Sequence, residues 1–122
     1  MGKNLLILDD DPDFVSPLVK RLQWAGHATL AFFDLKDLRE NPQCLRNTDV
    51  ILCDFLMPGD GKFFCWRAVL EALKEIPSPP RMLLMSGLGQ ENAEVIRVVK
   101  KFGLCGYLAK PVDFAALEKF LV

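Results

Sequence analysis

The sequence has few of the residues that build common metal and redox sites. It contains one histidine, His27, and its four cysteines show no Cys-x-x-Cys spacing and no companion histidine. This pattern disfavours a structural zinc site and leaves a cysteine metal site as the weaker alternative. Because the start of the chain has no signal-peptide pattern, we interpret the cysteines as reduced thiols of a cytoplasmic protein. They are Cys44, Cys53, Cys65 and Cys105.

The sequence also lacks an excess of charge and long apolar runs. Its formal net charge is −1, so nothing indicates direct binding to nucleic acid or to an anionic membrane. No apolar run approaches the length of a membrane span. The 122 residues, 51% of them hydrophobic, suffice for one well-packed core, and we expect a single domain over residues 1–122.

Apolar strands alternate with amphipathic helices along the whole chain. The helices show start and stop signals such as Asp11-Pro12 before the first and Gly26 after it. This order is typical of an α/β protein with a doubly wound sheet of five parallel strands and five helices. The predicted strands cover residues 4–8, 27–33, 48–53, 81–85 and 106–109, and the predicted helices 12–25, 34–40, 62–74, 90–102 and 113–122.

Two of the predicted helices have distinctive apolar faces. The third has an unusually thick face rich in aromatic residues, which we interpret as core packing rather than as a cofactor site. The first carries an inward stripe and contains Pro17, which removes one helical hydrogen bond and bends the helix. The inward stripe consists of Phe14, Leu18, Leu22 and Ala25, and the aromatic face of Phe63, Phe64, Trp66, Val69, Leu70 and Leu73.

Polar residues follow four of the five predicted strands. The carboxyl ends of parallel strands meet at one edge of a sheet, and ligands of open α/β sheets bind at that edge. One polar residue at a strand end usually caps a turn, but four sets at the same edge predict a site. They are Asp9, Asp10 and Asp11 after the first strand, Asp54 after the third, Ser86 after the fourth and Lys110 after the fifth.

The residue types at this edge indicate phosphoryl chemistry. Crowded carboxylates repel one another unless a cation neutralises them, and Mg²⁺ prefers such oxygen ligands. The absence of histidine from the set argues against zinc and iron. Lys110 is placed to pair with a phosphate or with Asp54, and Ser86 to donate a hydrogen bond to a phosphoryl oxygen. A carboxylate with a divalent ion and a cationic neighbour is equipped to form an aspartyl phosphate.

Four ordered segments resemble the response-regulator receiver domain of two-component systems, over essentially the whole chain. The resemblance implies a flavodoxin-like fold with strand order 2-1-3-4-5. It also implies a phospho-acceptor signalling domain that catalyses its own phosphorylation and dephosphorylation. A sensor histidine kinase or phosphotransfer protein supplies the phosphoryl group, and a conformational switch signals to an effector. The segments are ILDDD (7–11), VILCDFLMP (50–58), LLMSG (83–87) and GYLAKP (106–111).

The resemblance also implies a role for individual residues. Asp54 is the phosphorylated residue, Lys110 pairs with the phosphate, and the Lys110–Pro111 peptide bond is cis. The switch consists of the Ser86 hydroxyl and the aromatic ring of Tyr107. The implied Mg²⁺ ligands are Asp10 directly, Asp9 through water, Asp54, and the backbone carbonyl of Leu56.

The chain departs from the family in two places. One residue, rather than two, separates Met57-Pro58 from Asp60-Gly61, so we expect a tighter loop beside Asp54. The segment before Tyr107 lacks the acidic residues that a winged-helix subclass uses to dimerise, so we do not expect that dimer.

Two further expectations concern partners and signal lifetime. Receivers dock their kinases through the first helix, so we expect Val15, Pro17 and Val19 to form part of the docking face. Leu56 and Leu88 flank the path of the hydrolytic water in receivers. As bulky apolar residues, they predict slow loss of the phosphoryl group.

Two other functions fit parts of the sequence. Asp9-Asp10-Asp11 contains the Asp-x-Asp pattern of haloacid-dehalogenase-like phosphatases, with Asp9 as nucleophile, but the later acidic pair and a cap insertion are not evident. A flavodoxin-like cofactor binder is disfavoured because three carboxylates stand where a phosphate would bind. The receiver accounts for more of the residues, either as a stand-alone protein or as one module of a longer chain.

Overall fold

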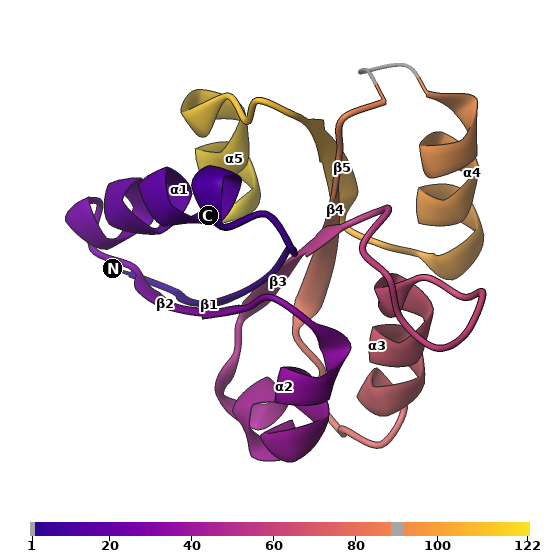
Figure 1. Cartoon of the computed structure of the whole chain (residues 1–122). Coiled ribbons are helices and arrows are strands. Elements are labelled where there is room, and N and C mark those ends of the chain that lie inside the picture. The colour runs from indigo at the N-terminus through magenta and orange to yellow at the C-terminus, as the bar shows by residue number, and fades with distance from the viewer. Residues whose placement is uncertain (1, 89–91) are drawn as a thin grey trace.

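The computed structural model describes residues 2–88 and 92–122 and has a five-stranded parallel sheet at its centre (Figure 1). The sheet order β2-β1-β3-β4-β5 confirms the predicted fold and strand order. The strands are short and strongly apolar, as expected when helices cover both faces of a parallel sheet. They are β1 (Asn4–Leu8), β2 (Ala28–Phe32), β3 (Val50–Asp54), β4 (Arg81–Ser86) and β5 (Gly106–Ala109).

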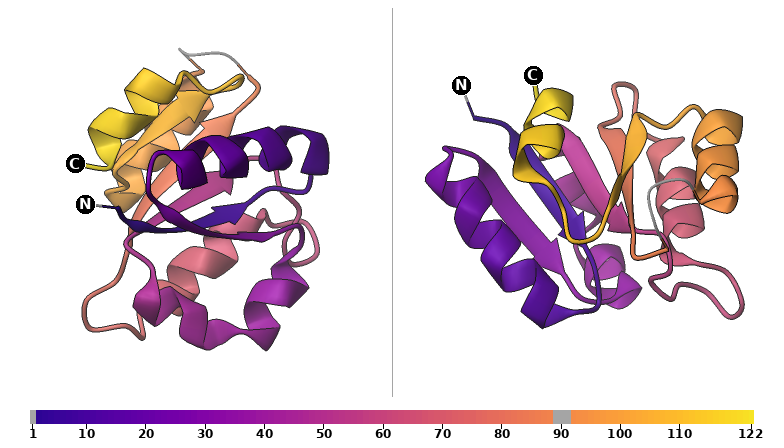
Figure 2. Two further views of the ribbon diagram at one scale, coloured as in Figure 1. Left: turned by 90° about the vertical axis from the view of Figure 1, so that its left-hand side faces the viewer. Right: turned by 90° about the horizontal axis from the view of Figure 1, so that it is seen from above.

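Helices cover the two faces of the sheet in separate layers. In Figures 1 and 2, α1 and α5 lie on one face, and α2, α3 and α4 lie on the other. Both ends of the chain lie on the same side of the molecule (Figure 2). The helices are α1 (Pro12–Trp24), α2 (Leu35–Glu40), α3 (Cys65–Leu73), α4 (Ala93–Phe102) and α5 (Phe114–Phe120), with a 3₁₀ helix at Pro42–Asn47 that the sequence did not predict.

Side-chain alternation along the strands divides the core into two clusters. Leu5 and Ile7 of β1 face α1 and α5, whereas Leu6 and Leu8 face α2, α3 and α4. Every residue of β3 is buried, because this central strand has neighbours on both sides and helices above and below. The polar residues at the strand ends therefore lie next to a closely packed sheet.

Most helix starts follow the predicted capping signals. The Asp11 carboxylate accepts a hydrogen bond from the Asp13 N–H, and Pro12 occupies the first turn of α1. Asp34 and Asp113 cap α2 and α5 in the same way. Gly103, with φ +65°, ends α4 in the left-handed conformation. Among the described residues, no helix is long and apolar enough to cross a membrane.

The packing of α1 corrects part of the prediction. The buried residues of α1 are Val15, Leu18 and Leu22, and Ala25 is exposed beyond the end of the helix. Val15 is only 2% exposed, because one helical turn before Leu18 it falls on the face that packs against the sheet. The prediction that Val15 belongs to an exposed docking face is therefore wrong.

The start of α3 is also later than predicted. The helix begins at Cys65 rather than at Lys62, because the preceding residues fold into a tight loop. Within this loop the Cys65 N–H donates to the Met57 carbonyl, and Pro58 and Phe64 form an isolated β-bridge. A Cβ atom on Gly59 would lie 2.7 Å from the backbone of Phe64 and Cys65, so only glycine allows this close approach.

Candidate functional site

The register of the sheet brings two of the predicted carboxylates together. Leu8 of β1 pairs with Cys53 of β3, so the next residues, Asp9 and Asp54, lie side by side at the carboxyl edge. Asp9 is fully buried, Asp54 is nearly so, and Asp10 is exposed. One carboxylate oxygen from each of the three residues lies within 4.8 Å of the other two. The predicted acidic cluster is thus present in the fold.

Lys110 reaches this cluster from the end of β5. Its Nζ donates a hydrogen bond to Asp9 Oδ2 at 2.6 Å and lies 3.5 Å from Asp54 Oδ1. The backbone N–H of Lys110 donates to the Ser86 carbonyl at 2.8 Å, which holds the end of β5 against β4. The Lys110–Pro111 bond is cis, as predicted. We call Asp9, Asp10, Asp54, Ser86 and Lys110 together the acidic site.

Burial and neighbouring charges have opposing effects on the pKa values of Asp54 and Lys110. Burial raises the pKa of the Asp54 carboxyl, the positive charge of Lys110 partly offsets that rise, and the charge of Asp9 adds to it. Burial alone lowers the pKa of Lys110, but the hydrogen bond to Asp9 and the charge of Asp54 outweigh burial and leave it raised. Lys110 is therefore a firmly cationic group facing an excess of carboxyl groups.

Backbone donors complete the acidic site. The Leu56 N–H lies 3.4 Å from Asp54 Oδ1, and the Leu88 N–H donates to Ser86 Oγ at 3.0 Å. Ser86 is fully buried and follows Met85, the residue of β4 that pairs with Asp54. The side chains of Leu56 and Leu88 are 43% and 45% exposed. These two side chains therefore lie outside the core, while their backbone N–H groups face Asp54 and Ser86.

Other predicted residues lie outside this cluster. Asp11 caps α1, and its backbone N–H donates to Asp9 Oδ1, so it supports the acidic site without adding a carboxylate to it. Tyr107 of β5 is half-buried and packs against the core cluster on the α3 and α4 side. Pro17 is exposed and Val19 half-buried on α1.

Two contacts near the site were not foreseen from the sequence. The Lys110 ammonium lies 4.4 Å from the ring centroid of Phe14, which we expected only to fill the core. The Arg39 guanidinium of α2 binds both carboxylate oxygens of Asp60, with 2.6 Å from Nη1 to Oδ1, and ties the loop after Asp54 to α2. Both contacts join residues far apart in the sequence, so no local sequence pattern predicts them.

The residues of the acidic site fit a hard divalent cation. The three clustered groups supply only oxygen atoms, and one of them, Asp10, is open to solvent. Three carboxyl groups share one ammonium group, so the cluster retains an excess of acidic groups for a cation to neutralise. This donor set matches the preference of Mg²⁺ and Ca²⁺ for carboxylate and water oxygens.

The family model for the response regulator receiver domain matches residues 5–121. Similar folds occur in a receiver domain protein from Clostridium thermocellum (20% identity, 98% of this chain and 90% of that chain covered, TM-score 0.74). They also occur in a Francisella receiver domain, with 24% identity, 95% of this chain and 90% of that chain covered, and a TM-score of 0.72. A Burkholderia pseudomallei response regulator has 24% identity, with 99% of this chain and 67% of that chain covered, and a TM-score of 0.76.

No curated protein sequence gives a significant match. Structural likeness at these identities establishes the fold, whereas the family model covers nearly the whole chain. The chain therefore belongs to the response regulator receiver domains, which are signalling domains of two-component systems and work with a kinase or phosphotransfer partner.

Proposed function

We propose that Asp54 accepts a phosphoryl group from a histidine kinase or phosphotransfer protein in a divalent-metal-dependent reaction. The observation that carries the proposal is the position of its carboxylate, beside the Asp9–Lys110 pair at the carboxyl end of a fully buried strand. The chain is a receiver over residues 1–122, and its output is a change of conformation that an effector reads.

The transfer is a nucleophilic displacement at phosphorus. An Asp54 carboxylate oxygen attacks the phosphorus, a P–O bond forms, and the bond from phosphorus to the donor's histidine nitrogen breaks. The nitrogen keeps the electron pair. The Lys110 ammonium, 3.5 Å from Asp54 Oδ1, is placed to pair with a phosphoryl oxygen, and the Ser86 hydroxyl to donate to another. Rigid placement of these groups by β3, β4 and β5 supplies the orientation that the reaction needs.

The metal would be held by Asp10, Asp54 and the Leu56 carbonyl, with Asp9 acting through water. When bound, a divalent ion neutralises charge that develops on the phosphoryl oxygens. The Burkholderia pseudomallei structure contains a phosphorylated aspartic acid and a calcium ion, which supports the same assignment here. We propose Mg²⁺ as the physiological ion, because it binds readily through one or two carboxylates together with phosphate oxygens.

The test is labelling with acetyl phosphate followed by mass measurement of the intact protein. The expected result is one added phosphoryl group in Mg²⁺, none in EDTA and none in Asp54→Asn. Label that persists in Asp54→Asn, or that forms equally well in EDTA, would contradict the proposal. The phosphatase alternative makes the opposite prediction, namely that Asp9→Asn loses a covalent phosphate that Asp54→Asn retains.

We also propose that Ser86 and Tyr107 form the switch. The Ser86 hydroxyl now accepts a hydrogen bond from the Leu88 N–H. A phosphoryl group on Asp54 would draw the hydroxyl away from this bond. The ring of Tyr107 on β5 would then change its packing on the α4 side. Ser86→Ala is expected to accept the label while losing the change in the NMR shifts of β5 that labelling produces in the wild type. Equal shift changes in both proteins would exclude Ser86 from the switch.

We propose that the kinase docks on the other two residues of the predicted face, the exposed Pro17 and the half-buried Val19. Val15 is excluded, because it is buried. Pro17→Glu is expected to slow transfer from a phosphorylated histidine kinase several-fold and to leave labelling by acetyl phosphate unchanged. Equal slowing with both donors would show that the substitution disturbs the acidic site rather than docking.

A further inference from the structure

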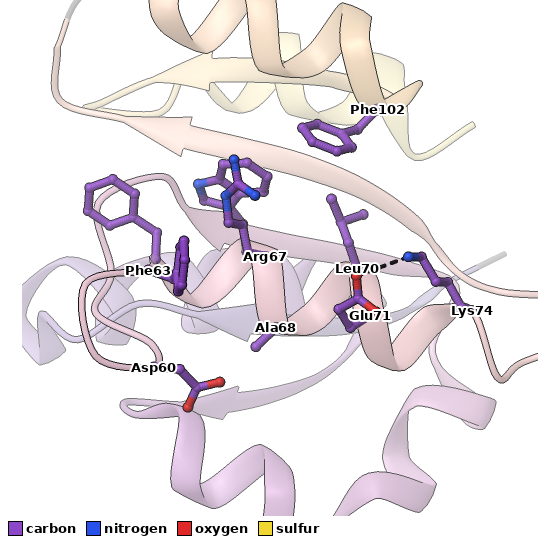
Figure 3. Close-up of a pocket in the computed structure, with 10 residues that line it drawn as sticks. Asp60, Phe63, Arg67, Ala68, Leu70, Glu71, Lys74 and Phe102 are labelled. Atoms are coloured by element: carbon purple, nitrogen blue, oxygen red, sulfur yellow. Dashed lines mark hydrogen bonds and ion pairs between the residues drawn. The ribbon is translucent and has the colours of Figure 1, made fainter.

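A second concave region lies between α3 and α4, away from the acidic site. One part of this region is a cavity of about 310 Å³. Figure 3 shows Arg67 of α3 between Phe63 and Phe102, which also line the cavity. An adjoining cavity of about 620 Å³ shares Leu70, Lys74 and Phe102 with the first, so the two form one elongated depression. We call this depression the aromatic groove.

The walls of the aromatic groove expose large apolar side chains. Phe63 is 50% exposed and Phe102 is 39% exposed, and the rings of Phe102 and Trp66 lie 5.4 Å apart. The Trp66 side chain is buried, and its indole Nε1–H has no hydrogen-bond partner among the described residues. This donor is buried under the groove wall, so the surface that a ligand meets at this end is the apolar surface of Phe63 and Phe102.

Charge around the aromatic groove is unevenly compensated. Its two acidic residues are already paired, Asp60 with Arg39 and Glu71 with Lys74. Arg67 pairs with no carboxylate in the described part of the chain. Its guanidinium instead lies over the rings of Trp66, Phe63 and Phe102, at 5.1, 5.7 and 6.0 Å from the centroids.

Positive charge without a paired carboxylate also occurs along α4. Lys101 lies 5.5 Å from the centroid of Phe102, and neither Lys101 nor the neighbouring Lys100 pairs with a carboxylate within residues 2–88 and 92–122. A guanidinium that stacks on aromatic rings keeps its N–H edge available for a carboxylate, which is the geometry of its strongest hydrogen bonds. The groove therefore complements a ligand that is both apolar and anionic.

The shape of the groove favours a protein segment over a small molecule. Ligand pockets enclose most of a small molecule, whereas two of the aromatic walls here remain exposed to solvent. Aromatic residues and arginine are also the residue types enriched at the centres of protein interfaces. We propose that the aromatic groove binds a short acidic segment of a partner protein, which inserts an apolar side chain beside Trp66 and sets a carboxylate against Arg67.

The proposal is independent of phosphoryl transfer, since none of the groove residues belongs to the acidic site. The experiment is selection of a displayed random-peptide library on the wild-type chain, followed by affinity measurement of the enriched peptides. We expect peptides with an aromatic or large aliphatic residue next to Asp or Glu. Their affinity should fall about tenfold or more in Arg67→Glu and in Phe102→Ser. Asp54→Asn should bind them unchanged.

Lys20→Glu on α1 is the matched control, because it makes the same change of charge at an exposed site outside the groove. It should bind the peptides like the wild type. NMR mapping of a selected peptide on the wild-type chain gives a reading that does not depend on any variant, and it should move amides of α3 and α4. The proposal is overturned when no acidic peptides are enriched, when Arg67→Glu binds as well as the wild type, or when the moved amides lie elsewhere. A concentration-dependent dimer that Arg67→Glu abolishes would assign the groove to a second copy and overturn it as well.

Discussion

The acidic site and the aromatic groove differ in how their charged side chains are neutralised. In the acidic site, buried carboxylates face a cation directly, with 2.6 Å between Lys110 Nζ and Asp9 Oδ2. In the groove, Arg67 lies over aromatic rings and no described carboxylate pairs with it. In the first arrangement, three carboxyl groups share one ammonium group, so acidic groups are in excess. The second keeps a positive charge for an anion from outside. The comparison shows that burial alone does not decide what a charged side chain such as Lys110 or Arg67 can bind. The groups that already neutralise its charge matter as well.

The largest effect is expected from removing the cation of the acidic site. Lys110→Met leaves the buried Asp9 carboxylate without its partner, which should lower the free energy of unfolding by about 3 kcal/mol in EDTA. Added Mg²⁺ should restore part of the loss, because it binds the folded state. Urea denaturation with and without Mg²⁺ measures both effects.

Lys74→Met is the matched control for this variant. It breaks an exposed pair with Glu71 at 2.9 Å, and exposed pairs contribute about 0 to 1 kcal/mol. An equal loss in the two variants would mean that the pair of Lys110 with Asp9 stabilises the fold no more than an exposed pair does.

The second prediction concerns the loop that joins the two regions. Gly59→Ala places a Cβ atom against the backbone of Phe64 and Cys65, and overpacking of this kind costs about 1 to 3 kcal/mol. Gly87→Ala is the control, since a Cβ there meets no atom within 4 Å among the described residues other than its chain neighbours. Thermal unfolding followed by circular dichroism compares them. Equal midpoints would show that the loop adjusts easily and that α3 is not fixed by this contact.

The third prediction concerns the lifetime of the phosphoryl group. Leu56 and Leu88 have exposed side chains and backbone N–H groups that face Asp54 and Ser86, and we expect their bulk to shield a phosphoryl group on Asp54 from water. The double variant Leu56→Asn/Leu88→Glu should lose its phosphoryl group about tenfold faster or more, because polar side chains admit and orient water. Decay of the labelled protein is measured after the donor is removed. Decay no faster than that of the wild type would show that the leucines are not the barrier.

The smallest effect is expected at the surface link between the loop and α2. Arg39 lowers the pKa of Asp60 through their hydrogen bond, so the pair stabilises the folded state only where Asp60 is ionised. Arg39→Ala should slightly lower the unfolding temperature at neutral pH. The difference from the wild type should vanish in acid, below the lowered pKa of Asp60. A difference that persists in acid would point to lost packing instead.

The fold and the acidic site were largely predictable because their signals are local. An apolar run followed by a polar residue marks a strand end, and parallel strands bring such ends together without further information. Asp9, Asp54, Ser86 and Lys110 follow this logic, and the structure places all four at one edge. Asp10 joins them because it is adjacent to Asp9 in the chain.

The aromatic groove was not predictable in the same way. We interpreted Phe63, Phe64 and Trp66 as one buried helical face, which is right for Trp66 and wrong for the half-exposed Phe63. Helix α3 begins at Cys65 because backbone contacts of the preceding loop fix its start. Phe63 therefore leaves the helical register. Contacts of that kind join residues by tertiary geometry and leave no periodic trace in the sequence.

The two tryptophans of the chain occupy opposite environments. Trp24 is 91% exposed at the end of α1, whereas Trp66 is 3% exposed and stacks on Phe55, the residue after Asp54. A soluble quencher such as acrylamide should therefore extinguish the emission of Trp24 and spare that of Trp66. In a Trp24→Phe variant, the remaining emission comes from a single indole in contact with both Phe55 and the aromatic groove. The protein thus carries its own optical reporter at the place where the two regions meet.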